Sequence, residues 1–413
     1  MTNLTQRNFF GAVVRVATLA LFLVTFGASA TLAQTKGYVT NFLDDTVSAI
    51  DTATNTVIAT VPVGVRPAGV AVTPNAAFAY VTNQDNDSVS VIDTATNIVI
   101  TTVPVGDFPS GIAITPNGAF AYVENNFSHT VSVIATATNT VVATVPVGAT
   151  PTGIAITPNG ALAYVMHIAF NTVTIIDTAT NTVVATIPLP SPVATAFTPN
   201  GAFAYVATLF NTVTVIDTTT NTATATVTVG FFPTGIDITP NGAFAYVTNT
   251  LSNTVSVIDA ATNTVVATVP VGVFPEGIAI TPNGAFAYVA NSGANNVSVI
   301  DTTTNTVIAT IPVGNVPQSI AFPRTQDPIA SLIAEVQALI ADGSLTQNQG
   351  AGLLDKLNQV AAKLAADQTG AACNQLAAFN NQVQGFINNG SLTQAQGQAL
   401  IDAVNTLRTS LGC

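Results

Sequence analysis

The seven tyrosines of this chain are almost evenly spaced, and that spacing constrains the fold more than any other feature of the sequence. They stand at Tyr38, Tyr80, Tyr122, Tyr164, Tyr205, Tyr246 and Tyr288. Successive intervals of 41 or 42 residues are typical of propellers and helical arrays. Each unit is rich in Thr, Val and Ile, and turn residues interrupt it about every ten positions, which favours strands. The tyrosines therefore mark seven copies of one strand-rich unit.

The unit around Tyr246 predicts four short antiparallel strands. They cover residues 235–239, 243–247, 254–258 and 264–271, and Pro-Asn-Gly and Asp-to-Asn segments supply the turns. Pro270 lies in the fourth strand and cannot donate a ladder hydrogen bond, so this strand belongs on an edge. Four antiparallel strands with a proline on the outer edge describe one propeller blade.

The two ends of the repeat predict how the ring closes. The repeat opens at Tyr38 with a second strand and finishes with a first strand at residues 318–322. Pairing these two ends completes a seventh blade without a covalent bond and leaves no open inner edge. We therefore predict an all-β, seven-bladed propeller over residues 36–323.

The recurring motifs carry a resemblance to a known repeat. Tyr38-Val-Thr-Asn41, Tyr80-Val-Thr-Asn83 and Tyr246-Val-Thr-Asn249, with recurring Asp-Thr-Ala-Thr-Asn and Thr-Pro-Asn-Gly segments, resemble the YVTN β-propeller repeat. The resemblance implies a seven-bladed propeller of the kind found in bacterial and archaeal surface proteins and in YncE-like exported proteins. It implies no single activity, because propellers host many functions.

After a linker at 324–327, the apolar period changes from two to 3.6, which predicts a small all-α domain over residues 328–413. The segment Gly343-Ser-Leu-Thr-Gln347 returns as Gly390-Ser-Leu-Thr-Gln394, so we expect two helical hairpins forming four helices. This part is similar to the FIMAH-type domain of secreted bacterial proteins.

The two cysteines lie in the helical domain. Cys373 is expected near the start of the third helix and Cys413 after the fourth, so antiparallel packing brings them together. We predict a disulfide between them; two free thiols are the alternative.

Residues 1–33 predict a secretory signal, because a charged start with Arg7 and Arg15 precedes an apolar stretch at residues 16–27 that is short for a membrane span. Small residues allow cleavage after Ala30 or Ala33; an uncleaved anchor is the alternative. We expect an exported protein, either periplasmic, extracellular or at the cell surface, and not integral to the membrane once cleaved.

The charge and the motifs exclude several functions. The net charge is -12, and the predicted propeller has two basic and 14 acidic residues, which opposes nucleic-acid binding. No zinc motif, phosphate loop or nucleophile elbow is present. We therefore predict no cofactor, no metal site and no catalytic residues.

Large and ionisable residues gather in two kinds of segment that share one face of a propeller. These segments are the loops between second and third strands and the connections between blades. We call the face that they share the variable face. Its candidate ligand-binding residues are Arg66, Asp107, Phe108, Phe127, His129, His167, Phe170, Phe210, Phe231, Phe232, Phe274 and Glu276. Propeller ligands usually meet such loops, although rings packed under their own loops would give the same pattern.

Two single residues have separate interpretations. His167 stands where most units have Asn, so it is either a structural residue bonded to the loop backbone or a ligand. Asp237 replaces Ala in a first strand and is expected to face the channel, meeting either water or a cation.

These observations favour an exported, non-catalytic binding or scaffold protein whose partner is an envelope protein, a peptide or a glycan. The first alternative is a metal-dependent hydrolase, by analogy with propeller lactonases. The second is single-stranded nucleic-acid binding, which the YncE resemblance suggests and the charge opposes.

Overall fold

The computed structural model describes residues 36–324, 328–341, 343–365 and 368–413. The predicted signal segment at residues 1–33 and residues 325–327 of the predicted linker lie outside the described residues.

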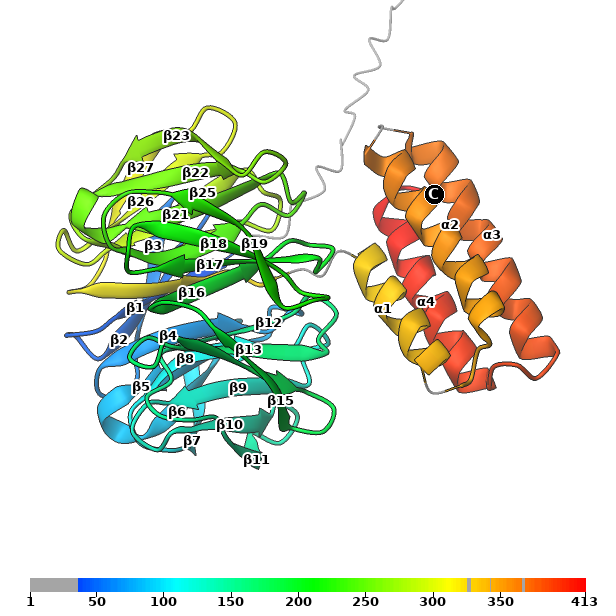
Figure 1. The fold of residues 1–413 in the computed structure, drawn as a ribbon, viewed down its shortest axis with the longest axis horizontal. Coiled ribbons are helices and arrows are strands. Elements are labelled where there is room, and N and C mark those ends of the chain that lie inside the picture. Colours follow the sequence, from blue (N-terminus) through cyan, green and yellow to red (C-terminus); the bar gives the residue numbers. More distant parts are fainter. Residues whose placement is uncertain (1–35, 325–327, 342, 366–367) are drawn as a thin grey trace, which may run out of the picture. The chain divides into compact units, whose positions relative to one another are not determined.

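Seven four-stranded antiparallel sheets form the blades of a propeller (Figure 1). Blade 1 comprises β28 (Pro317–Ala321), β1 (Lys36–Asn41), β2 (Thr46–Asp51) and β3 (Thr56–Pro62); blade 2, β4 (Pro67–Val72), β5 (Phe78–Asn83), β6 (Ser88–Asp93) and β7 (Ile98–Pro104); blade 3, β8 (Pro109–Ile114), β9 (Phe120–Asn125), β10 (Thr130–Ala135) and β11 (Thr140–Pro146). Blade 4 comprises β12 (Gly153–Ile156), β13 (Leu162–His167), β14 (Thr172–Asp177) and β15 (Thr182–Pro188); blade 5, β16 (Pro192–Phe197), β17 (Phe203–Thr208), β18 (Thr212–Asp217) and β19 (Thr222–Thr228). Blade 6 comprises β20 (Pro233–Ile238), β21 (Phe244–Asn249), β22 (Thr254–Asp259) and β23 (Thr264–Pro270); blade 7, β24 (Pro275–Ile280), β25 (Phe286–Asn291), β26 (Asn296–Asp301) and β27 (Thr306–Pro312).

Burial follows the place of each strand in its blade. The middle strands are almost wholly buried, because apolar residues on both of their faces pack against neighbouring blades. The fourth strands alternate exposed and half-buried residues, as expected for an outer edge. The first strands of neighbouring blades contact one another around the whole ring, so they line the central axis.

The ring closes through blade 1, as the sequence predicted. Tyr38 pairs with Ala321 and Val39 with Ile320, so the last strand joins the first one of the repeat. The Phe322 ring then meets the Tyr288 ring edge-on, with centroids 5.0 Å apart. The seven-bladed fold is confirmed.

The repeated tyrosines join each blade to the next one. Each hydroxyl donates to the side-chain carbonyl of an asparagine in the neighbouring blade's turn between third and fourth strands, and each of these asparagines has a positive φ. The pairs are Tyr38–Asn97, Tyr80–Asn139, Tyr122–Asn181, Tyr164–Asn221, Tyr205–Asn263, Tyr246–Asn305 and Tyr288–Asn55. Asparagine is suited to both roles, because it tolerates the left-handed region and carries a carbonyl oxygen.

The C-terminal part consists of four helices, α1 (Pro328–Ala341), α2 (Gln347–Ala365), α3 (Thr369–Asn388) and α4 (Gln394–Ser410). Both hairpins carry a capping box, at Thr346 with Gln349 and at Thr393 with Gln396. Each of these glutamines also donates to a serine that precedes the other hairpin's second helix, so the two hairpins exchange equivalent bonds. No helix among the described residues is long and apolar enough to cross a membrane.

Cys373 and Cys413 meet as predicted. Their Cα atoms lie 5.8 Å apart and their Sγ atoms are at bonding distance. Formation of the disulfide in the protein itself stays a prediction.

We expect the tyrosines to resist ionisation until the propeller unfolds. Burial raises the pKa of Tyr80, Tyr122, Tyr164, Tyr246 and Tyr288 to about 12; an unfolded tyrosine has a pKa near 10. The stability that these neutral rings contribute is therefore complete below about pH 10 and falls as the pH rises toward about 12. Tyrosinate absorbance and far-ultraviolet circular dichroism, followed together, should change in a single transition. Gradual ionisation near pH 10 with the fold intact would contradict this, and the urea-unfolded chain provides the reference titration.

Candidate functional site

Seven equivalent hydrogen bonds fix the variable face. In each one, a residue in the loop between second and third strands accepts from the backbone N–H of a residue in the connection that follows the same blade's fourth strand, over 2.9–3.1 Å, and both residues have positive φ. The pairs are Asp45–Arg66, Asp87–Phe108, His129–Thr150, Asn171–Ser191, Asn211–Phe232, Asn253–Phe274 and Asn295–Val316. Both kinds of segment therefore lie on one face, as predicted. His129 has a structural role there, because its Nδ1 atom accepts one of these bonds.

The predicted aromatic residues divide into two groups. Phe127, Phe170, Phe210 and Phe231 are 56–66% exposed, whereas Phe108, Phe232 and Phe274 are less exposed and are held at positive φ. Some rings do contact neighbours: Phe108 stacks on Phe127 at 4.5 Å, and the Arg66 guanidinium lies 5.7 Å from the Phe42 ring centroid. Most of the rings thus face solvent rather than packing under their loops.

The other predicted charged residues of this face stand apart from one another. Arg66 forms an ion pair with Asp85 at 3.3 Å, where both side chains are exposed. Asp107 is exposed at a turn, and its backbone N–H donates to Ser128.

His167 is buried and bonded to the backbone of a connection. It is 2% exposed, and its Nδ1 atom bonds the carbonyl of Ala149 over 2.9 Å. Burial lowers the pKa of this imidazole, so the ring is kept neutral. It fills the place that asparagine holds in most other blades, and its Nε2 atom is buried with no hydrogen-bond partner among the described residues.

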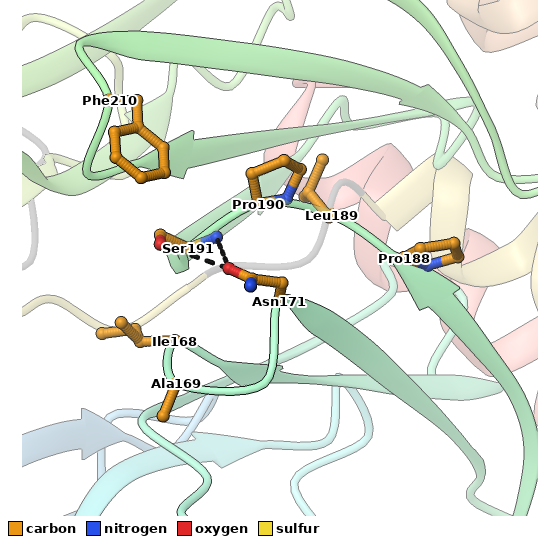
Figure 2. Close-up of a pocket in the computed structure, with 8 residues that line it drawn as sticks. All are labelled: Ile168, Ala169, Asn171, Pro188, Leu189, Pro190, Ser191 and Phe210. Carbon is orange, nitrogen blue, oxygen red and sulfur yellow. Dashed lines mark hydrogen bonds between the residues drawn. The ribbon is translucent and has the colours of Figure 1, made fainter.

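A shallow pocket of about 590 Å³ opens on the variable face between blades 4 and 5 (Figure 2). It is lined by Ile168, Ala169, Asn171, Pro188, Leu189, Pro190, Ser191 and Phe210. At the equivalent place in blades 2, 3, 6, 7 and 1, a connection glycine packs against the asparagine that ends the second strand. Here Pro190 replaces the glycine and Thr208 the asparagine, and the connection is one residue shorter. No lining residue is ionisable, so this pocket can hold an uncharged group but provides no acid or base.

The channel mouth on the variable face contains an accessible carboxyl group with a perturbed pKa. Glu276 is the second residue of β24, at the end of the strand that adjoins the variable face, and it is half-buried. Burial raises the pKa of Glu276 to about 7, and a hydrogen bond from Thr234 acts in the opposite direction. A carboxyl group of this kind can exchange a proton near neutral pH.

Sequence reasoning missed a second carboxyl group, Glu124. It is fully buried in β9, where it accepts hydrogen bonds from the Ser110 hydroxyl and from the Gly111 N–H. Burial raises the pKa of Glu124 to about 8. The signal was present, because Tyr122-Val-Glu-Asn125 breaks the Tyr-Val-Thr-Asn motif and the chain has only three glutamates.

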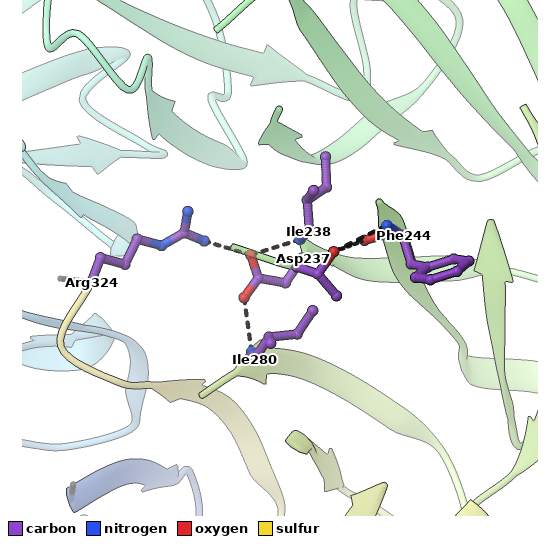
Figure 3. Close-up of polar contacts among 6 residues, drawn as sticks. Asp237, Ile238, Phe244, Ile280 and Arg324 are labelled. Atoms are coloured by element: carbon purple, nitrogen blue, oxygen red, sulfur yellow. Dashed lines mark hydrogen bonds and ion pairs between the residues drawn. The ribbon is translucent and has the colours of Figure 1, made fainter. Parts of the chain in front are cut away.

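Asp237 meets a cation from the chain itself. Its carboxylate accepts from the N–H groups of Ile238 and Ile280, both over 2.9 Å, and from Arg324 over 2.7 Å (Figure 3). Arg324 directly follows the last blade strand and is 76% exposed at its side chain, against 9% for Asp237. The carboxylate thus pairs with Arg324 and joins β20 to β24.

The residues present do not fit a metal site of the kind a metal-dependent lactonase needs. Among the described residues, no three His, Cys, Asp or Glu side chains come together to hold an ion. Asp237, the channel carboxylate, already has both oxygens engaged. We therefore derive no chemical step through a metal.

The fold defines a seven-bladed propeller with an appended helical domain, and comparison with known families agrees. Residues 38–144 and 182–315 match the family described as Lactonase, 7-bladed beta-propeller. The chain belongs to this family. Residues 329–409 match the FIMAH domain. No curated protein matches this chain.

Solved structures share the fold. A chain of hydrazine synthase from Kuenenia stuttgartiensis is 28% identical, with a TM-score of 0.61, over 64% of this chain and 92% of that one. A functionally unknown protein from Desulfotomaculum acetoxidans is 19% identical, with a TM-score of 0.63, over 70% and 98%. The dihydro-heme d1 dehydrogenase NirN is 13% identical, with a TM-score of 0.54, over 70% and 76%; at such identities the likeness shows the fold alone.

The family match corrects the expected function. We predicted a non-catalytic binding or scaffold protein, and membership of the lactonase propellers contradicts that prediction. It supports the first alternative, a propeller hydrolase, and indicates an enzyme. The sequence prediction was wrong because it searched for known linear motifs. The raised pKa values of Glu124 and Glu276 come from burial, which such motifs do not record.

Asp237 and Arg324 should contribute very differently to stability. Asp237→Ala leaves the buried N–H of Ile280 without its acceptor, which costs about 1–3 kcal/mol. Arg324→Ala removes only an exposed partner, which costs about 0–1 kcal/mol. Urea unfolding of the propeller measures both variants, and equal losses would contradict this assignment.

Proposed function

We propose that this protein is a hydrolase that opens cyclic esters (lactones) at the channel mouth on its variable face. Family membership supports the reaction class. The observation that carries the location is Glu276, a half-buried carboxyl group at that mouth whose pKa is raised to about 7.

Lactone hydrolysis needs a base, because neutral water is a weak nucleophile toward an ester carbonyl. The Glu276 carboxylate accepts a proton as water attacks the ring carbonyl, the ring C–O bond breaks, and the departing oxygen takes up the proton. The product is the open hydroxy acid. A base with a pKa near the working pH is effective, since it is largely ionised and still attracts a proton.

Replacing the carboxyl group should abolish this role while preserving its size. For Glu276→Gln we expect hydrolysis of cyclic esters to fall by about 100-fold or more, as for loss of a general base. In the wild-type protein, kcat/KM should rise with pH through about 7, because Glu276 must be deprotonated to act. Rates measured by pH-stat on a panel of lactones of different ring size test both expectations.

Glu335→Gln provides the matched control. Glu335 lies in α1, and burial also raises the pKa of its carboxyl group. This variant should hydrolyse lactones at the wild-type rate. A full rate in Glu276→Gln, or no hydrolysis of any lactone by the wild-type protein, would overturn the proposal.

We also propose that the protein is exported and acts in the periplasm or at the cell surface. The signal-like residues 1–33 and the resemblance to YVTN-type and YncE-like exported proteins support this. Protein recovered from the envelope or the medium should begin at residue 31 or 34, and its cysteines should be oxidised to the Cys373–Cys413 disulfide. N-terminal sequencing and thiol titration of the denatured protein measure both; an intact Met1 or two free thiols in such a fraction would contradict it.

A further inference from the structure

Glu124 occupies a place that threonine holds in blades 1, 2 and 6. There, Thr40, Thr82 and Thr248 each accept from a backbone N–H of their own first strand and donate to a carbonyl of the next blade, over 2.7–3.0 Å. These hydroxyls join two blades, and in blade 6 Thr248 also contacts the Thr234 hydroxyl over 3.3 Å. In blade 3 the longer glutamate keeps the bond from the first-strand N–H, at Gly111, over 2.7 Å.

The additional length of Glu124 places its carboxyl group against a hydroxyl. The Ser110 Oγ atom donates to Oε1 of Glu124, and the other oxygen, Oε2, is buried with no hydrogen-bond partner among the described residues. Among the described residues, Glu124 forms no ion pair with Lys36 or with Arg66. The carboxyl group therefore has no neutralising cation. In its ionised form such a group is a base, and the nearest proton it can accept is that of Ser110.

The surroundings hold this pair in place. A Cβ atom at Gly111 would lie 3.2 Å from the backbone of Gly153 and Ile154 in the next blade and 3.3 Å from Cγ of Glu124. The carboxyl stem is therefore confined between two first strands and the middle of blade 3. Confinement of this kind, together with the bond from the Gly111 N–H, keeps a base in hydrogen-bonding position.

Ser110 lies at the same level of the channel as Glu276. Each is the second residue of its first strand, β8 or β24, so both stand at the mouth on the variable face. Ser110 is half-buried, whereas Glu124 behind it is fully buried. The serine is thus the more exposed member of the pair, and its base stays shielded from water.

We propose that Ser110 is the nucleophile of this protein and Glu124 its base, so that lactones are opened through an acyl-enzyme. This inference rests on the proposed function and deepens it. A hydroxyl held by an adjacent carboxyl group is a nucleophile–base arrangement.

The steps balance without a further reactant. Ser110 Oγ bonds to the ring carbonyl carbon, its proton passes to Glu124, the ring C–O bond breaks, and the departing ring oxygen takes that proton. The result is an ester between Ser110 and the opened hydroxy acid. Water activated by Glu276 then attacks this ester, which releases the acid and returns a proton to Ser110 Oγ.

The covalent ester gives a readout that is independent of turnover. Full-length protein incubated with β-propiolactone, a strained cyclic ester, should gain the mass of one lactone at a single site, and peptide mapping should place it on Ser110. Glu276→Gln should accumulate this adduct, because its second step is slowed. Ser110→Ala should not form it.

Two further variants separate the base from the fold. Glu124→Thr restores the residue of blades 1, 2 and 6, so the propeller should fold, and acylation should slow by about 100-fold or more. Ser292→Ala removes a half-buried hydroxyl elsewhere on the variable face, one that donates to the Phe274 carbonyl, and should leave acylation unchanged.

The outcomes distinguish this inference from the proposed function. Lactone hydrolysis with no adduct on Ser110 in the wild type or in Glu276→Gln, or with full activity in Glu124→Thr, would overturn the covalent route and leave a hydrolase. Adduct on Ser110 without turnover of any lactone would support the pair and overturn the hydrolase. Neither adduct nor turnover would overturn both.

Discussion

The hydrogen bond from each tyrosine to an asparagine of the next blade is the contact on which the ring depends. It joins the buried centre of one sheet to a turn of its neighbour, and the last one, from Tyr288 to Asn55, joins blade 7 to blade 1. Because a buried hydroxyl without a partner is costly, the same two residues must recur in every unit. This explains why the repeat keeps its period even where its other residues change.

Because the same tyrosine–asparagine bond joins every pair of blades, the distinctive side chains of this protein lie at the few positions that depart from the repeat. Glu124 replaces a threonine, Asp237 replaces an alanine, and Pro190 with Thr208 replaces a glycine and an asparagine. Each replacement changes a local contact: a carboxyl group against Ser110, an acceptor for Arg324, and a pocket between two blades. The framework tolerates these exchanges since each one leaves the tyrosine–asparagine bond of its own blade intact.

The fold could be predicted from the sequence because it depends on periodic features, whereas the candidate site depends on single residues. Tyrosine spacing gave the number of blades, and the missing strands at each end gave the closure. The role of His129 could also have been found, since a polar residue recurs at its position in all seven units. The pairing of Asp237 with Arg324 could not, because it requires the path of the chain beyond the last strand. The perturbation of Glu276 likewise arises from burial at the channel, which no local motif records.

The match between connection glycines and second-strand asparagines sets the unit in which blades can be exchanged. A side chain in place of Gly64 would overlap Asn83, which ends the second strand of the following blade. The connection glycine and this asparagine must therefore be inherited as a pair. Recombination between the near-identical repeats of the gene therefore preserves packing only when its crossover points leave each connection with the second strand that follows it. The unit that can be exchanged in this propeller is consequently not one blade. It includes the connection between two sheets and therefore overlaps both of them.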